Sequence, residues 1–167
     1  MKKIIYSVCE SIVPLSSEKL NLPQWLFSLS DTDYQACSKS HIGAGASVLP
    51  DGKQTSLNVE SVGGHLMVQH YILEISTPNH IKLVSNSDCW LFRLWYVQLR
   101  VTWDMKLISK GENSVFRNEV IVEHPSLIMK VLTKLVLGQI FLKKHNKEET
   151  PLFAKNILEK QSVVNSD

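Results

Sequence analysis

The sequence predicts an α+β fold in which a curved antiparallel sheet of about seven strands wraps around a long C-terminal helix, with two short helices after the first strand. Apolar and polar residues alternate over much of the chain between His41 and His124, which indicates strands. The junctions between these strands are short, and short junctions favour an antiparallel meander over crossover connections. An apolar segment with helical spacing follows Pro125, and we expect this helix to pack against the sheet.

Length and composition indicate one globular domain. The chain has 167 residues, of which 44% are hydrophobic and 20% are charged, and this is enough to bury a single core. We assign residues 1–161 to this domain and residues 162–167 to a polar tail. The net charge is only +2, and Lys and Arg are spread along the chain among Asp and Glu. This distribution argues against a nucleic-acid partner. No apolar run reaches the roughly 18 residues that a membrane span requires.

The cysteines favour a reducing compartment. Cys9, Cys37 and Cys89 are odd in number and far apart, which fits neither a disulfide framework nor a zinc ribbon. We interpret them as reduced thiols of a cytoplasmic protein. The first residues do not form a typical signal peptide, because Glu10 interrupts a short apolar run and no small-residue cleavage site follows. No cofactor is expected.

The N-terminal part begins with a strand and continues with helices. The segment KKIIYSVCESIVPL combines β-branched residues with period-two alternation, which predicts a strand that ends at Pro14. Ser30 is a suitable N-cap, and the acidic residues after it favour the first turn of a helix. We expect two short helices, over about 17–28 and 30–40.

Turn signals divide the following segment into strands. Pro50-Asp51-Gly52 joins the first two as a hairpin, Gly63-Gly64 precedes a third, and Thr77-Pro78-Asn79 leads into a fourth. The last strand, SVFRNEVIVEH, follows a turn at Gly111.

The segment WYVQLRVTWDMKLI carries the clearest alternation in the chain. One face holds seven apolar residues at alternate positions: Trp95, Val97, Leu99, Val101, Trp103, Met105 and Leu107. The other face is mostly polar. This pattern predicts a long strand, central in the sheet, whose apolar face packs toward the C-terminal helix.

That helix, which begins after Pro125, is apolar on most of its circumference. Between Leu127 and Leu142 its apolar stripe is widened by further residues such as Met129 and Phe141. A sheet cupped around the helix is the simplest cover for so much apolar surface.

The segment HNKEET, residues 145–150, is open to three interpretations: helix punctuation, hydrogen bonding at the rim of a pocket, or a metal or catalytic site. His145 and Glu149 are four residues apart and share a helical face, as metal ligands on helices do. The zinc-protease pattern needs a second histidine at that spacing and a further ligand, and this segment has one histidine.

Punctuation is the interpretation we prefer for His145, Glu148 and Glu149. Asn146 can end a helix, and Thr150-Pro151 fits an N-cap followed by proline at the first position of a new helix. One unbroken helix over residues 126–160 would also span about 50 Å, longer than a domain of this size needs. We therefore expect a kink or a short break here, and no metal site.

The order of elements resembles that of the START/polyketide-cyclase-like superfamily (SRPBCC), whose members have the helix-grip fold. The resemblance covers nearly the whole chain and rests on the topology and on the tryptophan-bearing strand WYVQLRVTWDM. It implies an apolar cavity between sheet and helix that opens near the two short helices and holds a lipid, polyketide, hormone or aromatic hydrocarbon. The segment NLPQWLFSLSDTDYQACSKS departs from the family, because it lacks the single amphipathic helix that leads to a tryptophan-containing loop.

Candidate ligand contacts are aromatic residues and two polar residues in phase with apolar ones. Core packing explains most single aromatics, but as a group they suit an apolar ligand with one polar end. His70 and Asn118 each share a strand face with apolar residues, and burial without a partner would cost about 1–3 kcal/mol. The candidate ligand-binding residues are His70, Trp90, Phe92, Trp103, Asn118 and Phe141.

Three functions are compatible with these patterns. The first is a cytoplasmic carrier or sensor that binds a hydrophobic small molecule or lipid in the cavity. The second is an enzyme of the polyketide cyclase or aromatase kind, in which His70, Tyr71 or Asn118 orients and deprotonates the substrate. The third is an interaction module in which the apolar surface of helix 126–142 forms a homodimer. No phosphate loop or nucleophile elbow is present, so no catalytic residue is assigned.

Overall fold

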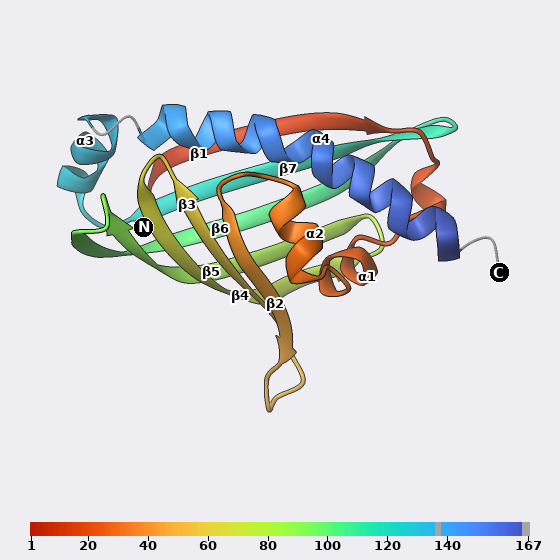
Figure 1. Cartoon of the computed structure of the whole chain (residues 1–167), viewed down its shortest axis with the longest axis horizontal. Coiled ribbons are helices and arrows are strands. Elements are labelled where there is room, and N and C mark those ends of the chain that lie inside the picture. Colours follow the sequence, from red (N-terminus) through yellow and green to blue (C-terminus); the bar gives the residue numbers. More distant parts are fainter. Residues whose placement is uncertain (136–137, 165–167) are drawn as a thin grey trace.

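The computed structural model, which describes residues 1–135 and 138–164, contains a seven-stranded sheet with a long helix along its concave face (Figure 1). The strands lie in the order β1-β7-β6-β5-β4-β3-β2, and every neighbouring pair is antiparallel. The elements are β1 (Lys2–Val13), η1 (Ser17–Lys19), α1 (Leu22–Phe27), α2 (Asp31–Ala36), β2 (His41–Val48), β3 (Gln54–Val62), β4 (His65–Thr77), β5 (His80–Leu91), β6 (Trp95–Lys110), β7 (Asn113–His124), α3 (Leu127–Leu135) and α4 (Gly138–Val164).

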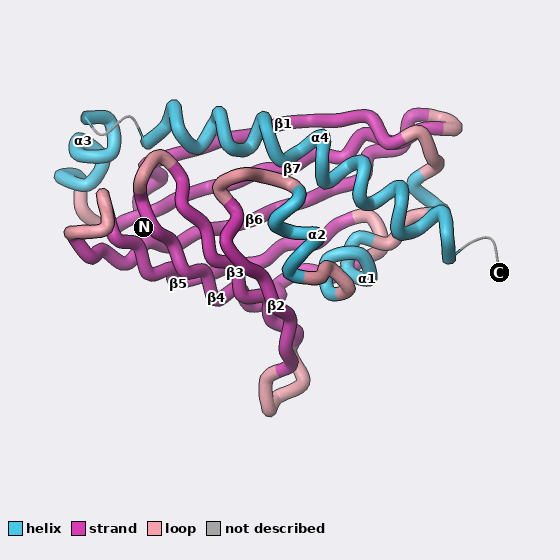
Figure 2. Tube along the Cα trace, in the orientation of Figure 1, coloured by secondary structure: helices cyan, strands magenta, loops and turns pink. Residues whose placement is uncertain are grey.

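The predicted α+β class and the meander are confirmed. Strands β2 to β7 pair in sequence order, and β1 pairs with β7 to complete the sheet. The hairpin of β2 and β3 turns at Pro50-Asp51-Gly52 and projects from the body (Figure 2). Gly52 there has φ +85°, a conformation that glycine adopts at little cost.

Strand β6 lies in the interior of the sheet, between β5 and β7, as its alternation predicts. The apolar residues from Leu99 to Leu107 are buried, and Trp103 contacts the ring of Phe153 on α4 at a centroid distance of 5.9 Å. Trp95, at the start of the strand, is 65% exposed, so the buried face is shorter than the seven-residue pattern.

Two short helices follow β1, in smaller pieces than predicted. Ser30 caps α2 in a capping box, because its side chain accepts from the backbone of Asp33 while the Asp33 carboxylate accepts from the backbone of Ser30. The first predicted helix is a 3-10 turn followed by α1, which is capped by Asn21.

Of the kink or short break expected at HNKEET, the break is wrong. Helix α4 runs without interruption from Gly138 to Val164 and includes Pro151. Proline removes the hydrogen bond to the carbonyl of Lys147, but both residues are exposed, so water can satisfy that carbonyl. The predicted single helix 126–142 is instead divided between α3 and α4, and residues 136–137 between them lie outside the described residues.

The C-terminal half of α4 is fixed by an aromatic cluster. Trp25 of α1 packs edge-on against Phe153 of α4 and Phe116 of β7, at centroid distances of 5.5 and 6.1 Å. Its indole nitrogen donates to Asn156 at 2.9 Å. Side chains therefore fill this end of the space between sheet and helix.

Helix α4 continues to Val164, into the predicted tail 162–167, and residues 165–167 lie outside the described residues. Within residues 1–135 and 138–164, no helix combines the length and the apolar character needed to cross a bilayer.

Candidate functional site

An apolar cavity of about 80 Å³ lies between the sheet and the N-terminal half of α4. Its wall is formed mainly by aliphatic side chains of the sheet and by Phe141 and Leu142 of α4, including Ile5, Leu91, Leu99, Val101, Val120 and Val122. The strands supply these residues from their inward faces, so the alternation that forms the sheet also forms the cavity.

The cavity does not open near the two short helices, which is where the family resemblance places the opening. Among the described residues, none from η1, α1 or α2 lines it. The reason is the cluster of Trp25, Phe116 and Phe153, which occupies the corresponding space at the other end of α4.

Phe141 closes one side of the cavity against the β3–β4 turn. A Cβ atom placed on Gly63 would lie 2.4 Å from Cγ of Phe141, so the ring occupies the space that any other side chain would need. Gly63 also has φ +59°. This turn therefore depends on glycine for both its backbone conformation and its contact with Phe141.

The structure brings three of the six candidate ligand-binding residues to this region. Trp103 and Phe141 line the cavity, and their contact with a ligand remains a prediction. Asn118 is fully buried beside it, where it accepts a hydrogen bond from the Trp103 indole at 2.7 Å. Trp90 packs against Tyr96 on the outer face, and Phe92 is exposed in the β5–β6 turn.

The inward assignment of His70 is wrong. It is exposed on the outer face of β4, while its neighbours Gln69 and Tyr71 line the cavity. Both faces of β4 carry large apolar residues, so the period-two pattern does not determine which face is buried. The inward polar residues of this strand are His65 and Gln69.

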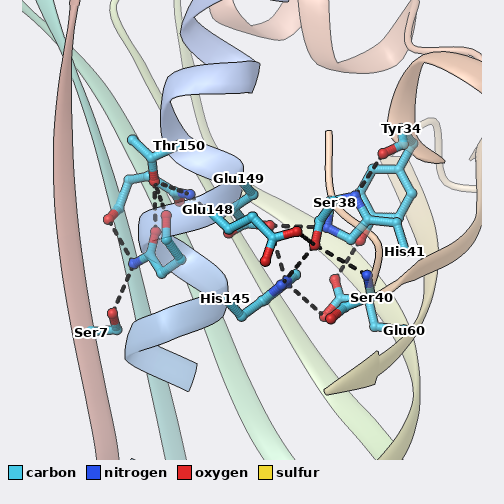
Figure 3. Close-up of polar contacts among 12 residues, drawn as sticks. Ser7, Tyr34, Ser38, Ser40, His41, Glu60, His145, Glu148, Glu149 and Thr150 are labelled. Atoms are coloured by element: carbon cyan, nitrogen blue, oxygen red, sulfur yellow. Dashed lines mark hydrogen bonds and ion pairs between the residues drawn. The ribbon is translucent and has the colours of Figure 1, made fainter. Parts of the chain in front are cut away.

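Four ionisable side chains form a buried cluster in one wall of the cavity (Figure 3). Nε2 of His41 lies 3.0 Å from a Glu149 oxygen, and Nε2 of His145 lies 3.2 Å from the same oxygen. Nε2 of His145 also lies 3.5 Å from Glu60. Glu60, His145 and Glu149 line the cavity directly.

Outer partners hold each of these side chains. The Tyr34 hydroxyl donates to Glu60, and Nδ1 of His41 donates to the Tyr34 carbonyl at 2.6 Å. Nδ1 of His145 lies 3.2 Å from the Ser38 hydroxyl. The Asn118 amide donates to the second oxygen of Glu149 at 3.0 Å.

Burial and charge act in opposite directions on this cluster. Burial disfavours the charged form of His145, but the carboxylates of Glu149 and Glu60 outweigh it and raise the pKa of His145 well above its ordinary value. Burial likewise opposes ionisation of Glu149, but His145 and His41 lower its pKa below the ordinary range. Burial, followed by the nearby carboxylates, raises the pKa of Tyr34, so its hydroxyl remains a donor.

Two polar atoms in the cavity wall lack a hydrogen-bond partner within the described part of the chain: Nε2 of His65 and Oε1 of Gln69. Nδ1 of His65 accepts from the backbone of Phe92 at 3.0 Å, so the proton of the neutral ring is on Nε2. Burial lowers the pKa of His65, which favours that neutral form. The wall thus offers one free donor and one free acceptor.

Five residues of the site are not anticipated by the sequence patterns: Tyr34, His41, Glu60, His65 and Gln69. A signal does exist in β3, where the polar residues Ser56, Asn58 and Glu60 alternate before Val62 and are all buried. A strand whose buried face is polar is unusual. The apolar residues Leu57 and Val59 between these positions suggest instead that the other face of β3 is the buried one.

Comparisons with known proteins identify the fold. TTHA0849 from Thermus thermophilus superposes with a TM-score of 0.59 at 14% identity, and the match covers 97% of this chain and 99% of that one. The Zhui aromatase/cyclase from Streptomyces sp. R1128 superposes with a TM-score of 0.60 at 6% identity, over 94% and 93% of the two chains.

A START superfamily protein from Mycobacterium smegmatis superposes with a TM-score of 0.51 at 12% identity, over 86% of this chain and 97% of that one. No protein-family model matches the sequence, and a search of curated proteins finds no match. At these identities the likeness establishes the arrangement of elements and leaves function to the site. The chain therefore has the START-like helix-grip fold, as its order of elements predicts.

Proposed function

We propose that the protein binds a compact, neutral, hydroxyl-bearing apolar molecule in the cavity between the sheet and α4. The observation that carries this proposal is a pair of polar atoms in a mainly apolar wall, on His65 and Gln69, that lack a hydrogen-bond partner among the described residues. A buried polar atom without a partner costs about 1–3 kcal/mol, so a ligand that supplies the partner gains affinity.

The positions of the two atoms define where the ligand's polar group lies. His65 and Gln69 are four residues apart on β4, which separates them by about 13 Å along the strand. One small hydroxyl group therefore contacts one of them. We assign the hydroxyl to Gln69, because Oε1 accepts the proton that a neutral hydroxyl donates.

Charge and volume restrict the class of ligand further. Glu60 and Glu149 line the cavity, so a carboxylate head group would meet two acidic side chains. A volume of about 80 Å³ is below the roughly 150 Å³ of an engineered cavity that binds benzene. A single ring therefore enters with some movement of the wall, and the half-buried Phe141 is the side chain best placed to turn.

Calorimetry with a matched pair of compounds tests the proposal. In metal-free buffer at pH 7, 4-ethylphenol should bind at one site per chain, at least tenfold more tightly than the 4-ethylbenzoate anion, which has a similar ring and tail. Gln69→Leu should weaken 4-ethylphenol binding by about tenfold, the value of one hydrogen bond. Gln98→Leu, on the exposed part of β6, is the matched control and should leave it unchanged. Equal affinity for both compounds would contradict the proposal.

Acid–base catalysis on the bound molecule is a second candidate function. It is supported by His145, Glu60 and Glu149, which line the cavity and whose side chains can donate and accept protons. His70 cannot take part, because it lies on the outer face. Incubation with hydroxylated aromatic compounds, followed by mass spectrometry, would reveal turnover that Glu149→Gln abolishes.

A homodimer is the third candidate, supported by exposed apolar residues near the start of α4. Ile128 and Val131 of α3 and Ile140 of α4 are 78%, 59% and 59% exposed. Exposed apolar surface of this kind is typical of an interface, and a second copy of the chain would cover it. Light scattering on the wild type and on Ile128→Asp would show a dimer that the substitution dissociates.

A further inference from the structure

The ionisable cluster has a geometry that hydrogen bonding alone does not require. One ring nitrogen of His41, one of His145 and a carboxylate oxygen of Glu60 all lie within 4.8 Å of one another. An oxygen of Glu149 lies 3.0 and 3.2 Å from the two imidazoles, outside this group of three, and a small shift of Glu60 or Glu149 would bring it to the same ion. Three different strands and helices supply these atoms, β2, β3 and α4.

Three of the separations among these side chains fit ligands that share one ion. Histidine and carboxylate ligands lie about 2.0–2.2 Å from a divalent transition metal. At that distance, separations of 3.0, 3.2 and 3.5 Å between donor atoms correspond to angles of about 90–115° at the metal. These angles lie in the range of tetrahedral and octahedral coordination, whereas 3.5 Å is long for a hydrogen bond between His145 and Glu60.

The other polar atoms of these side chains already form hydrogen bonds. Nδ1 of His41 donates to a backbone carbonyl, and the second oxygen of Glu149 accepts from Asn118. The remaining oxygen of Glu60 accepts from the hydroxyl of Tyr34. Such outer contacts fix the tautomer of a ligating histidine and the orientation of a ligating carboxylate. Only the atoms that converge on one another are left to bind an ion.

Charge balance favours the same conclusion. All four side chains are between 5% and 8% exposed, and two of them are carboxylates. Two buried negative charges are costly unless cations compensate them, and in the described structure their partners are the imidazoles of His41 and His145. A dication beside two neutral imidazoles balances Glu60 and Glu149 completely.

We propose that His41, Glu60, His145 and Glu149 bind one divalent first-row transition-metal ion. Two imidazole nitrogens and two carboxylate oxygens suit zinc, iron or manganese better than magnesium or calcium, which prefer all-oxygen sites. Since three of the four ligands line the cavity, remaining coordination positions face the space where a small molecule would lie. The HNKEET segment has one histidine, and His41 of β2 provides the second one.

Titration of chelator-treated protein with Co²⁺ tests this site directly. Co²⁺ that is bound by nitrogen and oxygen ligands at low coordination number absorbs visible light more strongly than aqueous Co²⁺ does. The wild type should develop this band, saturating at one ion per chain, and its Tm should rise with Co²⁺ concentration. Zn²⁺ should displace the band. Absence of both the band and the Tm rise would overturn the proposal.

Variants then assign the ligands. His41→Asn and Glu60→Gln should each weaken Co²⁺ binding by at least tenfold, the usual scale for losing one contact of about 1.4 kcal/mol. His70→Asn and Glu74→Gln, exposed on β4, are the matched controls and should bind as the wild type does. Binding that survives in His41→Asn and Glu60→Gln but is lost in His70→Asn would place the ion elsewhere and contradict the assignment.

The metal site and the ligand of the proposed function are independent. Co²⁺ binding is measured with no organic compound present, and 4-ethylphenol binding is measured in metal-free buffer. Failure of either measurement therefore leaves the other intact.

Discussion

The side-chain amide of Asn118 on β7 donates a hydrogen bond of 3.0 Å to Glu149 on α4, and both residues are buried. The same Asn118 accepts from the indole of Trp103 at 2.7 Å. One residue thus connects the sheet, the cavity wall and the ionisable cluster.

Replacement of Asn118 by leucine should be strongly destabilising. It would leave the Trp103 indole and an oxygen of Glu149 buried without their partner, at a cost of about 2–5 kcal/mol in the free energy of unfolding. Urea denaturation measures this loss. Asn86→Leu, at an exposed position of β5, should change the same quantity by less than about 0.5 kcal/mol. Similar losses in both variants would contradict the role assigned to Asn118.

Gly63→Ala should destabilise the fold through its contact with Phe141. The added methyl group meets the ring at 2.4 Å, in a backbone conformation that alanine already disfavours. We expect about 2–4 kcal/mol, against about 1 kcal/mol for Gly52→Ala, which shares the positive φ but faces open space. In a Phe141→Ala background the cost of Gly63→Ala should fall toward that of Gly52→Ala. An unchanged cost in that background would refute the contact.

Asp33 should make stability depend on pH in the acid range. Its hydrogen bonds to Lys160 and Ser30 lower its pKa from 3.8 to about 2. A carboxylate with a lowered pKa stabilises the fold above its unfolded pKa, and that contribution is lost as pH falls from about 4 to 2. The difference in unfolding free energy between wild type and Asp33→Asn should therefore be constant above pH 5 and shrink below pH 4. A difference that grows on acidification has the wrong sign.

The thiols of Cys37 and Cys89 should resist alkylation in the folded protein. Burial is the largest cause that raises their pKa values, to about 12 for Cys37 and about 11 for Cys89, so little thiolate is present at pH 8. Iodoacetamide followed by peptide mass spectrometry should label Cys9, which is partly exposed, before the other two. In urea all three should react at similar rates. Equal labelling in the native state would contradict this burial.

Local patterns were sufficient for most of the fold. The alternation in β6 predicts its interior position, and Ser30 with Asp33 predicts the start of α2, because these signals depend on neighbours in the sequence. Strand β4 shows the limit of such signals. Its two faces are both apolar enough to be buried, so the phase of His70 is decided by contacts with other strands.

The site was the least predictable part, because its partners are distant in sequence. His145 and Glu149 resemble punctuation when only HNKEET is considered, with Pro151 after them. Their roles depend on His41 and Glu60, which lie about a hundred residues earlier in the sequence and which the sheet brings next to α4. The helix tolerates Pro151 because it lies on the exposed face.

Methyl NMR shows whether the cavity between the sheet and α4 binds a ligand. Titration with 4-ethylphenol should shift the methyl signals of Leu99, Val101 and Leu142, which line the cavity, and the shifts should saturate together. Shifts confined to Ile128 and Val131, exposed on α3, would show binding to the surface and contradict the claim.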